Sequence, residues 1–132
     1  MAKKNKLVID TNLWVSWLIS GRKSHLNRIL LDEQAIIFSS SEQVIELFEV
    51  IERGKFRKYL TRQLIDEFKL FFLESVNIVK VTIKVEACPD PDDDFLIALA
   101  VTAGADYLVT GDKVLLGMKK YKLTKVIPVN RY

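Results

Sequence analysis

The sequence predicts an α/β fold: a three-layer α/β/α sandwich with a mainly parallel central sheet of about five strands. Two observations carry this prediction. Short apolar runs alternate along the chain with longer stretches whose apolar residues repeat at helical spacing, and such alternation is typical of parallel sheets. The chain has 132 residues, of which 49% are hydrophobic and 28% charged, as in an ordinary globular domain. We expect residues 1–132 to form one domain.

The strands are expected where apolar residues cluster in short runs. The five runs are residues 6–9, 35–38, 79–85, 107–109 and 126–127. Four of them are continuous apolar runs apart from Lys6 at the start of the first, which is typical of strands buried on both faces. The run 79–85 instead alternates between apolar and polar residues, which is the pattern of a half-exposed strand. Pro128 restricts the last strand to an edge or an end of the sheet.

Helices are expected where apolar residues recur at intervals of three and four. Four such stretches are residues 11–20, 61–76, 92–103 and 114–118. Two more helices begin at capping serines, one at Ser24 and one at Ser40 or Ser41. Glycines end three of the helices: Gly21 the one over 11–20, Gly54 the one that begins at Ser40 or Ser41, and Gly104 the one over 92–103.

Composition excludes several classes of protein. No run approaches the ~18–20 apolar residues that a membrane span needs. The basic N-terminal segment 1–6 leads into a stretch broken by Asp10 and Asn12, which does not fit a signal peptide. Cys88 is the single cysteine and His25 the single histidine, so a disulfide framework and a Cys/His zinc site are both excluded. This cysteine usage predicts a reducing, cytoplasmic location, with Cys88 as a packing residue.

Charge is unevenly distributed, although the net charge is only +3. Residues 86–94 contain five acids and no base, whereas residues 53–62 and 113–131 contain five and six bases and no acid. Concentrated acid beside concentrated base suggests a metal site next to a polyanion-binding surface. Solvated faces explain such runs equally simply. The candidate phosphate-binding side chains are Arg53, Lys55, Arg57, Lys58, Lys113, Lys119 and Lys120.

Four carboxylates are expected to meet at one edge of the sheet, because the loops at the carboxyl ends of parallel strands line a shared crevice. Asp10 ends the first strand and Asp112 follows the strand over 107–109. Asp94 begins the helix that leads into that strand. Glu46 lies about one and a half turns into its helix, within reach of the same edge.

Such a cluster fits a divalent cation. Neighbouring carboxylates repel one another and raise each other's pKa, and Mg²⁺ or Mn²⁺, as one or two ions, relieves that repulsion with hard oxygen ligands. A cation so held activates water and neutralises charge on a phosphate. Phosphodiester hydrolysis needs only carboxylates, metal and water, while the basic runs would hold the phosphate backbone.

Each carboxylate also has a simpler interpretation. Asp10 could cap a helix, Asp112 could be a turn residue, and Glu46 could be solvated. The acids over 92–94 could serve only the dipole at a helix N-terminus. Trp14 and Trp17 are expected in the core or at a protein interface. A receiver-like phosphoacceptor domain would need an acceptor Asp at the end of a middle strand, and the run 35–39 has none.

Five ordered motifs cover nearly the whole chain. They are the hydrophobic-Asp-Thr-Asn opening over 7–12, Ser40 with Val-Ile-Glu-Leu over 44–47, the segment 50–56, the Asp-Pro-Asp-Asp region over 88–98, and Gly-Ala-Asp-Tyr-Leu-Val-Thr-Gly-Asp-Lys over 104–113. Together they resemble the PIN-domain family, and within it the small prokaryotic toxin components of type II toxin–antitoxin systems. The resemblance implies a PIN-like sandwich and a metal-dependent endoribonuclease.

The resemblance also implies residue roles and partners. The family's metal-binding and catalytic carboxylates match Asp10, Glu46, Asp94 and Asp112, with Asp94 selected by its spacing to later motifs. The implied supporting residues are Thr11, Asn12, Ser40, Asp92, Asp93 and Thr110. A homodimer and a cognate antitoxin whose tail covers the active site are implied as well, with RNA as substrate.

The chain departs from the family pattern at two positions. Pro89 stands where the family often has Arg, and Val114 stands where it often has a second Asp. The second departure keeps an alternative open: a non-catalytic RNA-binding or scaffold PIN domain, which would bind RNA without metal and without forming a product.

Overall fold

The computed structural model describes residues 3–132, so the first two residues of the basic segment 1–6 lie outside the described residues. Strands and helices alternate as expected. In chain order the elements are β1 (Asn5–Ile9), α1 (Thr11–Ile19), α2 (Leu26–Leu30), β2 (Ala35–Ser39), α3 (Ser41–Ile51), a 3₁₀ turn (Gly54–Phe56), α4 (Arg62–Ser75), β3 (Val76–Ile78), α5 (Pro91–Ala103), β4 (Tyr107–Val109), α6 (Lys113–Met118), β5 (Lys120–Tyr121), β6 (Thr124–Ile127) and a 3₁₀ turn (Val129–Arg131).

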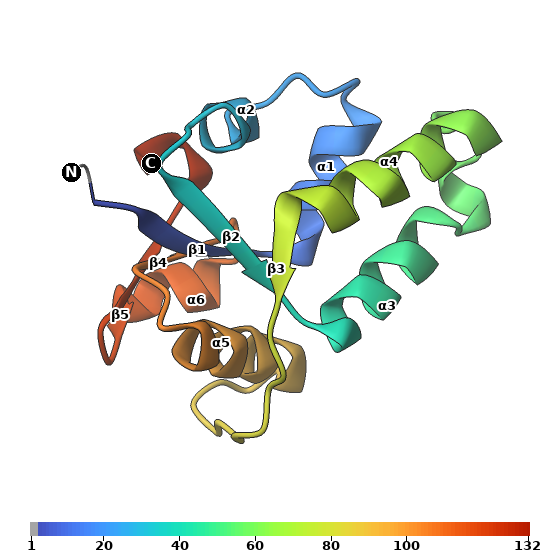
Figure 1. Ribbon diagram of the computed structural model, residues 1–132. Helices are drawn as coiled ribbons and strands as arrows, with labels where there is room; N and C mark the ends of the chain where they lie inside the picture. Colours follow the sequence, from blue (N-terminus) through green and yellow to red (C-terminus); the bar gives the residue numbers. More distant parts are fainter. Residues whose placement is uncertain (1–2) are drawn as a thin grey trace.

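The strands form one sheet in the order β3-β2-β1-β4-β6-β5. All neighbouring pairs are parallel except β5 and β6. Helices cover both faces of this sheet (Figure 1), with α1 to α4 on one side and α5 and α6 on the other. The predicted α/β sandwich with a mainly parallel sheet is therefore confirmed, with six strands in place of about five.

Two hydrophobic clusters hold the layers together, and β1 contributes to both. Leu7 and Ile9 face the first cluster, whereas Val8 faces the second, because successive side chains of a strand point to opposite faces. Trp14 and Trp17 are buried in the first cluster, beside Phe68. The expectation that both tryptophans belong to the core is confirmed.

The predicted strand over 79–85 is wrong. The edge strand is β3, and the connection from Val79 to Asp90 continues without ladder pairing. The physical reason is that the partner strand ends: Val79 N–H donates to the carbonyl of Ser39, the last residue of β2. The alternating pattern arises because Val79, Val81 and Val85 pack on the cluster around α5.

Helix boundaries follow local chemistry. Ser40, of the two serines considered, caps α3, and its Oγ accepts a hydrogen bond of 3.1 Å from the N–H of Gln43. Gly104 ends α5 with a φ of +62°, a left-handed conformation that glycine adopts without a steric penalty. No helix within residues 3–132 is long and apolar enough to cross a membrane.

Candidate active site

An acidic cleft of about 320 Å³ lies at the carboxyl edge of the sheet, where β1, β2 and β4 end. Asp10 follows β1, Asp112 follows β4, and Glu46 projects from α3. The first turn of α5 completes the cleft. The carboxylates that line it are Asp10, Glu46, Asp90, Asp92, Asp93 and Asp112. Three of the four carboxylates chosen from the sequence therefore lie in one cleft.

Asp10 is the most enclosed of these carboxylates, with 6% of its surface exposed. Its Oδ1 accepts a hydrogen bond of 3.1 Å from the N–H of Asn12, so Asp10 also caps α1. Its Oδ2 accepts a hydrogen bond of 2.7 Å from the hydroxyl of Thr110. Each carboxylate oxygen keeps a second acceptor site, so Asp10 is held in one orientation and can still bind a ligand.

Asp112 follows β4, the parallel neighbour of β1, and lines the same cleft as Asp10. Its Oδ1 accepts hydrogen bonds from the N–H groups of Val114 (2.8 Å) and Leu115 (3.1 Å), which caps α6. The N–H of Asp112 donates to Oγ1 of Thr110 at 3.0 Å. Thr110 thus links the two aspartates directly. The capping interpretation of Asp10 is correct, and Asp112, which could have been a turn residue, is instead the cap of α6. Both capping roles are compatible with a place in the cleft.

Gln43 organises the floor of the cleft, and sequence reasoning missed it. The side chain is 3% exposed. Its Nε2 donates to the carbonyl of Ile9 at 2.7 Å and to Oγ1 of Thr11 at 3.4 Å, while its Oε1 accepts from the hydroxyl of Ser39. The available signal was Gln three residues after the cap Ser40, a pattern typical of a capping box. A capping box would place the Gln43 amide on the backbone at the start of α3. In the structure the amide instead connects α3 to β1 and β2.

Asp93 is the carboxylate of the α5 turn that is buried beside the cleft, with 8% of its surface exposed. Burial raises the pKa of Asp93 to about 6, and the negative charges of Asp112, Asp90 and Asp10 add to the rise. Asp90 caps α5 by accepting from the N–H of Asp92 at 2.9 Å. The interpretation of this acidic turn as a helix N-terminus is correct, and the turn also supplies carboxylates to the cleft.

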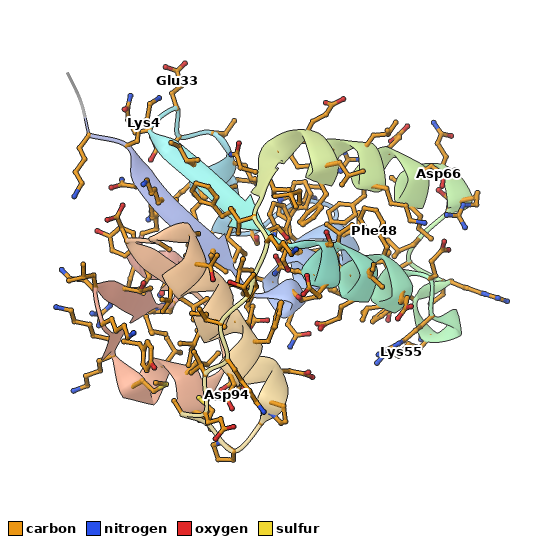
Figure 2. All side chains as sticks on the ribbon, turned by 60° about the horizontal axis from the view of Figure 1, so that its bottom comes forward. Lys4, Glu33, Phe48, Lys55, Asp66 and Asp94 are labelled. Carbon is orange, nitrogen blue, oxygen red and sulfur yellow. The ribbon has the colours of Figure 1, made fainter. Side chains whose placement is uncertain are left out.

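Asp94 does not join the cleft. Its Oδ1 accepts hydrogen bonds from the N–H groups of Ala87 (2.9 Å) and Cys88 (2.7 Å). It lines a different hollow, with Val85 and Phe95, and Figure 2 shows it beside the connection that precedes α5. Consecutive helical residues project about 100° apart, so Asp93 faces the cleft and Asp94 faces that connection. The expectation that Asp94 meets Asp10, Glu46 and Asp112 is corrected accordingly.

The cleft carries an excess of negative charge. Burial raises the pKa of Glu46, and the carboxylates of Asp92 and Asp10 raise it further, while the hydroxyl of Thr11 opposes the rise. Arg53 supplies the cationic side chain of the lining. Carboxylates pressed together in this way favour protonation or a bound cation.

The donors suit a hard divalent cation, because carboxylate oxygens are the ligands that Mg²⁺ and Mn²⁺ prefer. As placed within residues 3–132, no three His, Cys, Asp or Glu side chains lie close enough together to hold one ion. Mg²⁺ usually keeps several waters and binds directly through only one or two carboxylates. Asp10, Glu46, Asp93 and Asp112 are the carboxylates of the cleft available to such an ion.

The two basic runs lie at different places. Arg53 lines the cleft, and Lys55 lies beyond the end of α3 (Figure 2). Lys119 and Lys120 instead belong to the segment that enters the β5–β6 hairpin, whose turn lies at the amino edge of the sheet, opposite the cleft. Lys113 is exposed at the start of α6, next to Asp112.

Comparison with known proteins gives one match. A family model described as PIN domain matches residues 6–114, a range that contains every carboxylate of the cleft. Neither a curated protein nor a solved structure matches the chain at a significant level.

Proposed function

The chain belongs to the PIN-domain family, whose members are generally nucleases, and from this premise we propose that it is a metal-dependent endoribonuclease. The reaction would be hydrolysis of an RNA phosphodiester bond. Water adds to phosphorus and the bond to the 3′ oxygen breaks, which leaves a 3′-hydroxyl and a 5′-phosphate. The observation that carries the proposal is the buried, oriented carboxylate of Asp10 in a cleft lined by five further acids.

We assign the cation to Asp10, Glu46, Asp93 and Asp112. Bound there, Mg²⁺ or Mn²⁺, as one or two ions, would supply a Lewis acid that lowers the pKa of water and neutralises phosphate charge. Asp94 is left out of the set because its carboxylate lines a different hollow, where it accepts the N–H groups of Ala87 and Cys88.

The chain's other polar groups fix these donors in place. The hydroxyl of Thr110 donates to the carboxylate of Asp10 and accepts the backbone N–H of Asp112. One side chain therefore fixes the positions of two proposed cation ligands. Gln43 holds the backbone of Ile9 and the hydroxyl of Thr11. Arg53 at the mouth of the cleft would attract the phosphate. Groups that orient ligands in this way typically change activity by about 10–100-fold when removed.

The test is cleavage of a mixed pool of single-stranded RNA and tRNA with Mn²⁺, with Mg²⁺ and with EDTA, by the wild type and by Asp10→Ala. We expect metal-dependent cuts with 5′-phosphate ends that are absent in the variant. Undiminished cleavage in EDTA or full activity in a folded Asp10→Ala protein would refute the proposal.

A second candidate function is an RNA-binding or scaffold domain without catalysis. One observation favours it: Val114 is exposed at the position where the family often has Asp. Isothermal titration with Mn²⁺ separates the two functions. RNA binding without detectable binding of Mn²⁺ would support the scaffold.

We also propose that the protein is the toxin of a toxin–antitoxin pair and forms a homodimer. Large apolar side chains exposed on the helical face support a protein partner, among them Leu31, Leu70 and Leu73. Expression of the protein alone should arrest growth, and the Asp10→Ala variant should not. Co-expression of an adjacent reading frame should relieve the arrest. Light scattering should give twice the chain's 15.2 kDa.

A further inference from the structure

The acidic cleft repels the polyanion that it is proposed to cut. Six carboxylates and one cationic side chain, Arg53, line it, so a phosphate that enters meets net negative charge. Affinity for a nucleic acid must therefore come from a neighbouring surface, because contacts to the phosphate backbone supply most of the non-specific binding energy. The inference below rests on the proposed function and identifies that surface.

Helix α3 leads from the cleft to a basic segment. Glu46, Val50 and Arg53 follow one another at intervals of four and three along and just beyond α3, and all three line the cleft. With a rise of about 1.5 Å per residue, Glu46 and Arg53 are separated by about 10 Å along the axis. Arg53 also lines the next hollow, together with Phe56 and Arg57. We call residues 53–59 the basic arm.

The cations of the basic arm are available for a ligand. Arg53, Lys55, Arg57 and Lys58 form no ion pair within the part of the chain that the structure describes. Arg62, the next base along, differs: it binds Glu52 at 2.7 Å and Asp66 at 2.9 Å. The arm therefore ends before Arg62, whose charge is neutralised internally.

Aromatic rings alternate with these cations. Nζ of Lys55 lies 5.1 Å from the ring centroid of Phe56, and Nζ of Lys58 lies 5.3 Å from that of Tyr59. Tyr59 is 53% exposed, so its side chain is accessible from solvent. Basic grooves with accessible aromatic rings bind single-stranded nucleic acid, because bases that are not paired can stack on the rings.

The second basic run, residues 113–131, does not lead away from the cleft as the basic arm does. Lys120 pairs with Lys125 across β5 and β6, and the turn between these strands lies at the edge of the sheet opposite the cleft. Its cations are no less exposed than those of the arm, but no residue of this hairpin lines the cleft. Position, and not charge alone, distinguishes the two runs.

We propose that the basic arm binds the RNA strand that leaves the cleft along α3. Arg53, Arg57 and Lys58 bind its phosphates, and the ring of Tyr59 stacks on one unpaired base. The ligand is single-stranded RNA, because a base held in a duplex cannot reach the ring.

The test measures binding separately from cleavage. A fluorescein-labelled single-stranded oligoribonucleotide of about 12 nucleotides, within the range of ~4–16 that single-strand sites cover, is titrated in EDTA, and Kd is determined at several salt concentrations. In Arg57→Ala/Lys58→Ala we expect Kd to rise roughly tenfold and the salt slope to fall by about 1.4, since each phosphate contact contributes ~0.7. Tyr59→Ala should weaken binding about fivefold or more, whereas Tyr59→Phe should bind as the wild type.

Lys120→Ala/Lys125→Ala is the matched control, because it removes two exposed charges from the opposite edge; it should leave Kd and the salt slope near their wild-type values. Equal losses in both double variants, unchanged binding in the arm variant, or no RNA binding by the wild type would overturn the inference. Cleavage is assayed independently with Mn²⁺. Binding through the arm without cleavage would contradict only the nuclease, whereas cleavage that does not depend on the arm would contradict only this inference.

Discussion

Oγ1 of Thr110 lies 2.7 Å from Oδ2 of Asp10, across 100 positions of sequence. The contact exists because Ile9 of β1 pairs with Val109 of β4, so the residues that follow both strands emerge side by side. The N–H of Asp10 also donates to the carbonyl of Val109 at 2.9 Å. The orientation of the central carboxylate is thus a property of the neighbouring strand.

Thr110→Val removes this hydroxyl while keeping the shape of the side chain. We expect cleavage to fall by about 10–100-fold, because Asp10 loses its orienting donor, and binding of Mn²⁺ to weaken in parallel. Kinetics and isothermal titration measure the two effects. Thr102→Val is the control, since its hydroxyl bonds only the helix carbonyl of Ala98; equal losses in both variants would contradict the role given to Thr110.

Gln43→Ala should lower both stability and activity. The substitution leaves the carbonyl of Ile9 and the hydroxyl of Ser39 without their buried partner, which typically costs about 1–3 kcal/mol in the free energy of unfolding. Urea unfolding measures this loss. Gln63→Ala serves as the comparison, because Gln63 is exposed and bonds only Glu67 one turn away. We expect kcat to fall in Gln43→Ala with KM for RNA nearly unchanged.

Asp93 and Asp94 are neighbours with opposite expected effects. Asp93→Ala should abolish metal-dependent cleavage, because it removes a carboxylate proposed to hold the cation. Asp94→Ala should retain cleavage but lose about 1–2 kcal/mol of stability, since two backbone N–H groups lose a charged acceptor. Cleavage assays and thermal unfolding of both variants decide between them. The reverse result would restore Asp94 to the site.

The raised pKa of Asp93 predicts how stability changes with pH in EDTA. The pKa is about 6 in the folded chain against 3.8 for the ordinary group, so the folded state binds the proton more tightly than the unfolded state. This contribution is present below about pH 4 and is lost as pH rises through 6. Asp93→Asn should therefore be more stable than the wild type at pH 7, with the advantage shrinking toward pH 4.

Thermal unfolding at both pH values measures this difference. Addition of Mg²⁺ should raise the Tm of the wild type, because a ligand that binds only the folded state stabilises it, and should raise that of Asp93→Asn less. If the difference in Tm between the wild type and Asp93→Asn did not change with pH, ionisation of Asp93 would cost the folded chain no stability.

Sequence alone located the features that depend on local chemistry. Asp10 directly follows one apolar strand and Asp112 comes shortly after another, and the carboxyl ends of neighbouring parallel strands necessarily meet. The choice between Asp93 and Asp94 lay beyond it, because one residue of offset turns a helical side chain by about 100°. The role of Gln43 could not be predicted, because its side-chain hydrogen bonds reach two strands, β1 and β2, that are distant in sequence or on another element. Residues 79–85 carry a strand pattern, but the neighbouring strand ends before them and leaves them without a partner.

The pairing of β1 with β4 also determines when the cleft comes into being. A chain that has folded only through α3 already holds Asp10 and Glu46, but Thr110 lies 100 positions after Asp10. Contacts between such distant segments require loop closure and form slowly. Maturation of the site is therefore tied to closure of the whole sheet. An incompletely folded molecule would carry these acids without the cleft, so the cleavage proposed above would begin only when the sheet is complete.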